Sequence, residues 1–296
     1  DGSTDEPLVA RIDVAALSGP AIARRWTNAT FGRSDLLLPP GDHAIRVAAR
    51  GYDTWEGTVS LTEEPTHVTV ALVRQAGLRL LEEDFDGASA AAWRFGLPDD
   101  TAHSGGWALG EPWPTFSGDV AAHDLFYAGP CMDASPGLGR RAAITGNLDS
   151  LTPGLDAVRG TTTLLSPPFD LYDSAGVRIL LQATLVNTTG VAETGLRLDL
   201  VRWTEDEGVL WQSPSMSVDD LSTQAALTGQ ALVAQAVEGA LLIDEPPSPS
   251  IVRLRLRAEG PPGAGTDPDG LLEIMVDEVL VLGLTAEAWD EENGDI

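Results

Sequence analysis

Residues 251–257 have the sequence IVRLRLR, in which arginine and leucine alternate. Successive side chains of a β-strand point to opposite faces of the sheet, so this pattern predicts a strand with one buried apolar face and one wet basic face. Carboxylates on neighbouring strands are the nearest partners for the three arginines, which makes a functional basic stripe the less favoured interpretation. The stretch therefore predicts an antiparallel sheet that covers a core with one of its faces.

Similar apolar runs bounded by glycine, proline and aspartate occur before and after this stretch. They lie at residues 78–85, 162–165, 177–185, 195–203 and 271–282. About 205 residues with one set of alternating strands fit a two-sheet jelly roll, so we expect a jelly-roll domain at residues 78–283. Two insertions are expected in it, near residues 112–141 and near residues 217–245. Asp219 and Asp220 favour the start of a short helix in the second insertion.

A smaller domain is expected at residues 8–75. Short runs with period-two alternation occur at residues 8–14, 44–47, 57–61 and 67–72, which predicts a small β-sandwich. Residues 1–7 read as a polar linker, and residues 284–296 as an acidic C-terminal tail. The first residue is Asp1 rather than methionine, so we expect a processed N-terminus from which a signal peptide has been removed.

The charge of the chain narrows the possible partners. The 296 residues include 45 acidic and 18 basic residues, for a formal net charge of −27, and every basic residue is arginine. Such a chain is repelled by nucleic-acid phosphates and by anionic lipid, so we expect neither as a partner. No apolar run is long enough to span a membrane. The single cysteine, Cys131, excludes an intrachain disulfide and any cysteine-rich metal site.

The smaller domain carries motifs of a known family. Residues 37–47 read LLPPGDHAIRV, residues 51–55 read GYDTW and residues 68–72 read VTVAL. Together they resemble the PEGA family of surface-associated β-sandwich modules. Residues 8–29 fit that family less well. The resemblance implies a structural or interaction role outside the cytoplasm rather than a reaction.

The larger domain carries six ordered motifs. They are EDFDG at 83–87, Trp93, GWALGEP at 106–112, AITGNL at 143–148, TLLSPPFDL at 163–171 and IMVDEV at 274–279. In this order they resemble the MAM-like and cleaved-adhesin-like (concanavalin-like) jelly rolls of secreted and surface proteins. Because such domains accompany many activities, the resemblance bears on the fold more than on the function.

Acidic residues at both ends of the larger domain are candidate calcium ligands. They are Glu83, Asp84 and Asp86 at the end of the first strand, and Asp277 and Glu278 in the last. Asp277 alternates with Met275, Val279 and Val281, so it is expected on an apolar face where a carboxylate needs a compensating partner. Ca²⁺ binds six to eight oxygen ligands, and the resemblance implies a structural calcium that joins the two strands. The alternative is that these are turn and surface acids, one of them satisfied by backbone amides.

Catalytic signatures are missing from the sequence. It contains no His-Glu-x-x-His zinc motif, no Gly-x-Ser-x-Gly elbow and no phosphate-binding loop, and a chain without lysine cannot form a Schiff base. We therefore expect a protein that is not an enzyme.

Eight tryptophans raise the possibility of a carbohydrate platform. Trp113 and Trp211 lie beside turns and are the candidate ligand contacts, although core packing is the more frequent role of tryptophan in a sandwich.

Two functions remain open. The first is a secreted or cell-surface structural or adhesion protein, a subunit of a larger surface assembly, with calcium and with other envelope proteins or its own copies as partners. The alternative is a carbohydrate-binding or accessory domain pair of a secreted hydrolase, with a glycan as partner.

Overall fold

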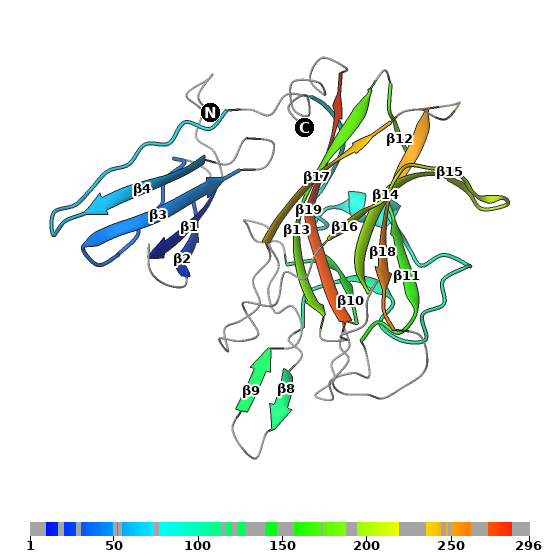
Figure 1. The fold of residues 1–296 in the computed structure, drawn as a ribbon, viewed down its shortest axis with the longest axis horizontal. Coiled ribbons are helices and arrows are strands. Elements are labelled where there is room, and N and C mark those ends of the chain that lie inside the picture. Colours follow the sequence, from blue (N-terminus) through cyan, green and yellow to red (C-terminus); the bar gives the residue numbers. More distant parts are fainter. Residues whose placement is uncertain are drawn as a thin grey trace. The chain divides into compact units, whose positions relative to one another are not determined.

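The chain divides into two compact units, Asp1–Ala76 and Gly77–Ile296, in a computed structural model (Figure 1). The structure describes residues 10–16, 21–27, 31–49, 52, 55–73, 77–113, 116–119, 124–127, 140–146, 157–172, 174–187, 194–218, 235–243, 247, 250–261 and 272–285. Each unit is treated by itself below.

Strands make up nearly all of the regular structure in the described residues. The first unit contains β1 (Arg11–Ala16), β2 (Ala21–Trp26), β3 (Gly41–Ala48) and β4 (Trp55–Leu61). The second unit contains β5 (Leu78–Glu83), the 3₁₀ turn η1 (Ala88–Ala92), β6 (Arg94–Phe95), β7 (Trp107–Gly110), β8 (Phe116–Asp119), β9 (Asp124–Tyr127), β10 (Ala142–Thr145), β11 (Thr161–Leu165), β12 (Phe169–Asp170), β13 (Gly176–Asn187), β14 (Gly195–Thr204), β15 (Gly208–Gln212), β16 (Met216–Val218), β17 (Gln235–Leu242), β18 (Ile251–Glu259) and β19 (Leu272–Leu284).

The first unit is built on one antiparallel sheet with the order β2-β1-β3-β4. Its core cluster includes Val47, Tyr52 and Leu72, with Trp55 packed against it. A Cβ atom on Gly57 would lie only 2.4 Å from the Trp55 ring, so the sequence WEG at the start of β4 leaves room for the indole to lie along its own strand.

Residues 67–72 differ from their prediction as a strand. They form no strand in the structure, yet Leu72 is buried and Val70 packs against the same core cluster. The alternating apolar residues of this segment thus serve packing over the sheet rather than strand pairing.

His43 joins the proline turn to the sheet. It is 3% exposed, and its Nε2 lies 2.8 Å from the carbonyl oxygen of Pro39. A buried histidine with a backbone partner is structural, which agrees with its lack of neighbours at metal-ligand spacing in the sequence.

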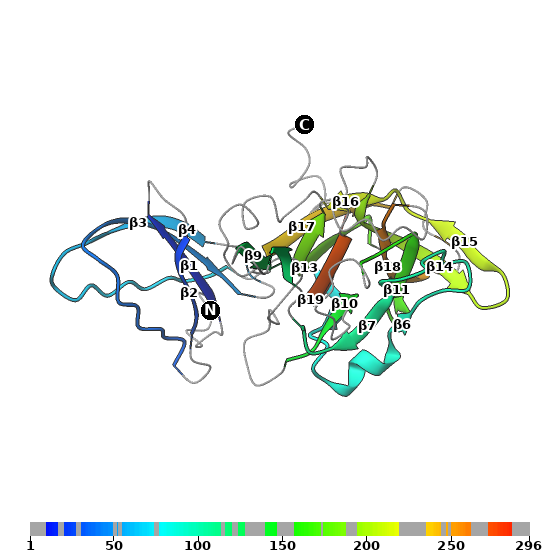
Figure 2. The same cartoon turned by 90° about the horizontal axis from the view of Figure 1, so that it is seen from below.

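The second unit contains two large antiparallel sheets, visible as separate layers in Figures 1 and 2. One has the order β17-β13-β19-β10-β7, with β5 paired to β19. The other has the order β15-β14-β18-β11-β6, with β12 paired to β18 and β16 paired to β14. The predicted all-β fold class is confirmed. Within the described residues no helix is long and apolar enough to cross a membrane.

The main core lies between these two sheets. Ile179 and Val281 from the six-stranded sheet, and Leu198, Leu254 and Leu164 from the seven-stranded sheet, are fully buried in one cluster. The strands β13, β14 and β18 contribute alternate residues to this cluster, which is the pattern expected of a sandwich with one inward face per sheet.

Parts of the predicted insertions lie outside the described residues. The first insertion contains the paired strands β8 and β9, while Cys131 is not described. In the second insertion the described residues 235–242 form β17, an edge strand, and the predicted helix start at Asp219 and Asp220 is not described. Neither residues 1–7 nor residues 286–296 of the acidic tail are described.

The turn after β12 yields a pH-dependent prediction. The Asp170 Oδ1 accepts hydrogen bonds from the Ser250 hydroxyl and from the Tyr172 amide, 2.9 Å away, and these bonds hold the pKa of the carboxyl below its ordinary value. A lowered pKa stabilises the fold above about pH 4, and this contribution is lost as pH falls through the folded-state pKa. We expect Asp170→Asn to lower the melting temperature at pH 7, and the difference from wild type to shrink below pH 4. Melting curves from pH 2 to pH 7 test this, and a difference that stays constant over that range contradicts it.

Candidate functional site

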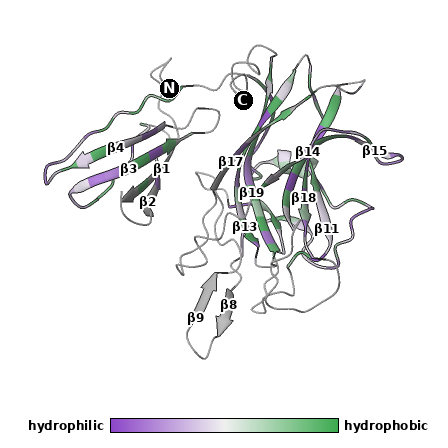
Figure 3. Ribbon diagram, viewed as in Figure 1, coloured by the Kyte–Doolittle hydropathy of each residue, from purple (hydrophilic) through white to green (hydrophobic). Residues whose placement is uncertain are grey.

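The outer face of the seven-stranded sheet carries an ordered set of charged residues. In β18, Val252, Leu254 and Leu256 are buried in the core, while Arg253, Arg255 and Arg257 lie on the opposite face. Figure 3 shows the resulting mixture of hydrophobic and hydrophilic residues along β14 and β18. The predicted division of this strand into an apolar and an arginine face is therefore confirmed.

A bidentate ion pair lies at the centre of this face. Asp199 of β14 is directly opposite Arg255 of β18 in the strand register. The Arg255 Nε and Nη2 donate to the two Asp199 carboxylate oxygens at 2.8 and 2.7 Å, and Gln212 donates to Oδ2 at 2.9 Å. The two side chains are only 6% and 3% exposed, so the pair is almost completely desolvated.

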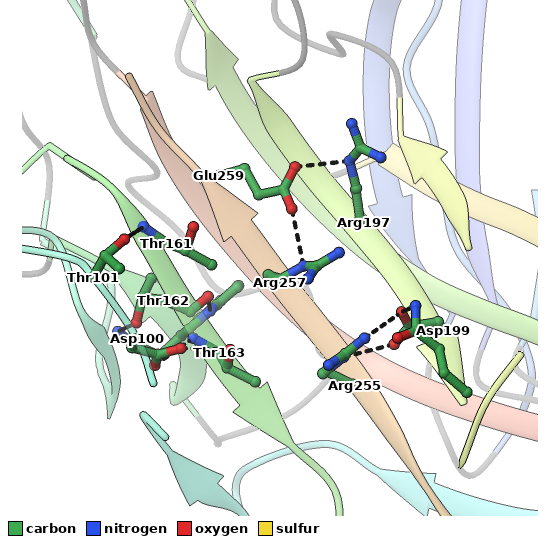
Figure 4. A network of polar contacts seen from close by, with 12 residues as sticks. Asp100, Thr101, Thr161, Thr162, Thr163, Arg197, Asp199, Arg255, Arg257 and Glu259 are labelled. Carbon is green, nitrogen blue, oxygen red and sulfur yellow. Dashed lines mark hydrogen bonds and ion pairs between the residues drawn. The ribbon is translucent and has the colours of Figure 1, made fainter. Parts of the chain in front are cut away.

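A second group of ion pairs continues along the same two strands. Glu259 bridges Arg197 and Arg257, with nitrogen–oxygen distances of 2.8 and 2.9 Å. Figure 4 shows this bridge beside the Asp199–Arg255 pair. These side chains are between 22% and 31% exposed, so part of each remains accessible to a ligand.

Asp100 links the segment after β6 to strand β11 of the same sheet by hydrogen bonds. The Asp100 Oδ2 accepts hydrogen bonds from the amides of Leu97 and Thr163, both at 2.9 Å, and Oδ1 accepts one from the Thr163 hydroxyl at 2.7 Å. Figure 4 shows Asp100 beside the threonines of β11. The carboxylate thus fixes a loop and a strand in one arrangement.

The other end of this face is an apolar cluster flanked by arginines. Leu97, Leu165 and Val201 are buried there, and Trp203 packs against them. The Arg94 guanidinium lies 4.7 Å from the centre of the Trp203 ring. Arg94 also pairs with Glu205, whose side chain is 73% exposed. We call the residues Arg94, Trp203, Glu205 and Arg253 the arginine–tryptophan cluster.

Arg253 completes this cluster. It is directly opposite Val201 in the register, and its Nη1 donates to the Ser166 carbonyl at 2.6 Å. Burial, and secondly the positive charge of Arg94, lower the pKa of Arg253 below its ordinary value. Arg253 is opposite Val201 and Arg94 is opposite Leu165, and both apolar residues belong to the same buried cluster, so the two arginines flank it.

The predicted calcium ligands lie elsewhere, and Glu83 is occupied by hydrogen bonds. Its Oε1 accepts the Phe85 amide at 2.8 Å and the Ser89 hydroxyl at 3.1 Å, and its Oε2 accepts the Trp93 indole at 3.0 Å. Glu83 is 3% exposed, so these donors satisfy a buried carboxylate. It holds the turn after β5 and packs the indole of Trp93 into the core.

Asp84 and Asp86 serve the same turn. The Asp84 Oδ1 accepts the Asp86 amide at 3.1 Å, and the Asp86 Oδ1 accepts the Arg141 amide at 3.0 Å. The Arg141 guanidinium donates to the carbonyls of Asp86 and Gly87. A cation of the protein is therefore already present beside Asp86.

The prediction that Asp277 shares a face with Val279 and Val281 is wrong. Leu180 pairs with Leu280 and Gln182 with Asp277, so the single residue Leu181 of β13 is opposite two residues of β19, Glu278 and Val279. Glu278 has a φ angle of 49° at this bulge. One extra residue moves the following side chains to the other face of the sheet.

Asp277 consequently lies on the outer face of the six-stranded sheet. Its strand neighbour Met275 packs there with Ala142 and Ile144, apart from the main core. Glu83 is opposite Val279, which belongs to the main core, so Glu83 and Asp277 lie on opposite faces. The first and last strands are neighbours as expected, but the bulge separates their carboxylates.

The five residues do not fit a calcium ion bound by all of them. Within the described part of the chain, no group of three or more His, Cys, Asp or Glu side chains could hold a metal ion. Glu83 and Asp86 are engaged by protein donors, and Asp277 is on the wrong face. Calcium binding at these five residues stays a sequence-based prediction, and their contacts favour the alternative of carboxylates satisfied by protein donors.

The two predicted tryptophan contacts differ in exposure. Trp113 is 54% exposed, whereas Trp211 is half-buried and packs against the main core. Trp203 and Arg94 were not among the residues singled out from the sequence. The signal that points to Trp203 is the alternating run RLDLVRW at residues 197–203, whose register against residues 253–257 only the structure supplies.

The described residues define an all-β protein whose larger unit is a two-sheet antiparallel sandwich. A family model described as the PEGA domain matches residues 34–76. No curated protein matches the chain.

Several solved structures resemble the chain at low identity. A cleaved adhesin domain of Lys-gingipain from Porphyromonas gingivalis is 12% identical, and the alignment covers 69% of this chain and 97% of that one with a TM-score of 0.39. A CBM22 xylan-binding domain of Paenibacillus barcinonensis Xyn10C is 14% identical over 72% and 99% of the two chains, with a TM-score of 0.33. A carbohydrate-binding module of the β-sandwich superfamily is 11% identical over 94% and 87%, with a TM-score of 0.37. These values are too low to transfer a ligand or an activity.

The arrangement around Glu83 and Asp86 gives the calcium hypothesis a direct test. Because protein donors already satisfy these carboxylates, we expect the same melting temperature in excess EDTA and in millimolar Ca²⁺. A bound ion at 100 times its dissociation constant would add about 2.7 kcal/mol to stability. A calcium-dependent rise of several degrees that disappears in Asp86→Asn would show that the ion binds here after all.

The buried ion pair gives a prediction about stability. Asp199→Asn leaves the Arg255 guanidinium uncompensated in a desolvated position, so we expect a loss of about 3–5 kcal/mol in the free energy of unfolding. The matched control is Arg79→Gln, which removes a pair with Glu82 whose side chains are 39% and 43% exposed. It should cost less than about 1 kcal/mol. Urea unfolding of both variants measures the difference, and equal losses would contradict the assignment.

Proposed function

We propose that this chain is a non-catalytic binding protein that works outside the cytoplasm. It acts in adhesion or as a subunit of a surface assembly, and the outer face of the seven-stranded sheet is its contact surface. The observation that carries the proposal is the rigid arrangement of partly exposed Arg197, Arg257 and Glu259 above a completely packed core.

The physical argument is preorganisation. The inward faces of both sheets are used for the core, whereas this outer face presents charged donors and acceptors in fixed positions. Cross-strand ion pairs hold those side chains before a ligand arrives, so little conformational entropy is lost on binding. Side chains fixed on strands are positioned more accurately than those on loops.

The smaller unit supports the location in this proposal. The PEGA domain model matches residues 34–76, and modules of this kind imply a surface-associated role. The strand pair of β3 and β4 places its polar residues in cross-strand contacts, such as the pair of Arg46 with Glu56 at 3.5 Å. A solvent-facing polar surface of this kind is compatible with a spacer or an interaction module.

A second candidate function is carbohydrate binding, as a module or as an accessory part of a secreted hydrolase. The observation that favours it is the stacked Arg94 and Trp203 pair beside the polar groups of the same face. An aromatic ring next to directional hydrogen-bonding groups is a common arrangement in ligand sites.

Arg197→Ala tests whether this face is the contact surface. Glu259 keeps its second partner Arg257 in the variant, so the fold should persist while one exposed donor is lost. Binding to immobilised polysaccharides and to envelope preparations, measured by biolayer interferometry, should weaken about tenfold, the effect of roughly 1.4 kcal/mol. Arg79→Gln is the control, and equal binding by wild type and Arg197→Ala to every ligand that wild type binds would place the contact surface elsewhere.

A further inference from the structure

The outer face of the seven-stranded sheet differs in charge from the rest of its unit. Residues 77–296 contain 35 acidic residues and 11 arginines. Five of those arginines lie on this one face: Arg94, Arg197, Arg253, Arg255 and Arg257. Guanidinium groups gathered on one face repel each other, so each of them is expected to have a nearby negative charge, either in the protein or in a ligand.

The carboxylates on this face pair with four of these arginines. Asp199 pairs with Arg255, Glu259 with Arg197 and Arg257, and Glu205 with Arg94. Arg253 donates to a neutral carbonyl, that of Ser166, and no carboxylate in the described part of the chain pairs with it. The face is therefore short of negative charge at Arg253.

The groups around Arg253 show where an external anion would bind. Arg94 is opposite Leu165 and Arg253 is opposite Val201, two residues of one buried cluster, and Arg94 stacks over Trp203 at 4.7 Å. Below them lie the buried side chains of Leu97, Leu165 and Val201. An anion between the two guanidinium groups would relieve their repulsion, and the low dielectric of the apolar layer below would strengthen its binding.

A ligand carboxylate would compete with Glu205 for the guanidinium group of Arg94. Its side chain is 73% exposed in a turn, so the ion pair with Arg94 contributes little to stability. A ligand carboxylate can replace it without breaking a buried interaction.

Resting on the proposed function, we propose that the arginine–tryptophan cluster binds an acidic glycan, with a sugar carboxylate between Arg94 and Arg253 and the sugar ring beside the exposed part of Trp203. Arginine binds carboxylates through paired hydrogen bonds, and the part of the indole that Arg94 and the buried cluster leave exposed can contact the apolar side of a pyranose ring. Arg257 and Glu259, which lie further along β18 beyond the Asp199–Arg255 pair, supply a donor and an acceptor for hydroxyl groups of a longer oligomer.

The net charge of the chain disfavours long polyanions, because a chain of charge −27 repels a nucleic acid with one phosphate per nucleotide. A short uronic-acid oligomer carries few charges in total. Each of its sugars joins a carboxylate, which arginine recognises, to a neutral, hydroxyl-rich ring.

The experiment compares two forms of one ligand on the full chain. Calorimetric titration with a galacturonic-acid trimer should show binding, and the methyl-esterified trimer should bind at least about tenfold more weakly, since it has lost the charge-assisted bonds. A sulfated oligosaccharide separates sulfate from carboxylate recognition. Equal binding of the acid and its ester overturns the proposal, as does tighter binding of the sulfated sugar than of the uronate.

Two variants locate the site. Arg253→Gln should lose at least about tenfold in affinity for the acid trimer, and Glu205→Gln should gain a few-fold, because the competing carboxylate is gone. Arg79→Gln is the control of equal charge change outside the face. The exposed Glu205 can be changed without risk to folding, so an unchanged or lower affinity in Glu205→Gln overturns the assignment even if Arg253→Gln unfolds.

A further ligand distinguishes this inference from the proposed function. A glutamate trimer that binds as tightly as the uronate, with the same loss in Arg253→Gln, would overturn the glycan in favour of an acidic peptide. Neutral glycans that bind equally well, with a loss in Arg197→Ala, would overturn the acidic ligand while the binding face stands.

Discussion

The register between β14 and β18 is the constraint on which the larger unit depends. Asp199 and Arg255 are opposite each other and form two hydrogen bonds on the outer face, while Leu198 and Leu254 are buried on the inner face. A slip of one residue would turn the leucines outward and leave both charges without their partners. The ion pair therefore specifies one register, and the core and the binding face follow from the same pairing.

Much of the fold could be predicted because strand alternation is a local property. The strands that contain residues 177–185, 195–203 and 251–258 were predicted within a few residues of β13, β14 and β18. Short strands such as β6 and β12 were missed, because two residues cannot show a period. Residues 67–72 alternate as a strand does but lack strand pairing, since packing alone also selects alternate apolar residues.

The candidate calcium residues show why site prediction from sequence is harder. Asp277 and Val279 are two residues apart, which places them on one face of any regular strand. The bulge at Glu278 reverses this, and it depends on the pairing with β13, which the sequence of β19 does not contain. Glu83 was rightly expected beside the last strand, but its donors Ser89 and Trp93 come from the following turn. The alternative of turn acids satisfied by protein donors fits these contacts better than a shared ion.

The net negative charge of the chain repels an anionic ligand at long range, whereas the arginines of the binding face attract it at short range. At low ionic strength the net charge of −27 repels any anionic ligand, whereas at about 0.15 M salt the screening length is about 8 Å and the ligand responds mainly to nearby groups. In the arginine–tryptophan cluster those groups are two guanidinium groups and one exposed carboxylate, that of Glu205, and they lie over an apolar layer. Salt weakens the repulsion by distant carboxylates more than the attraction of a partly buried contact. An acidic protein can therefore bind an acidic ligand through this face, and its remaining surface prevents the non-specific binding of other polyanions.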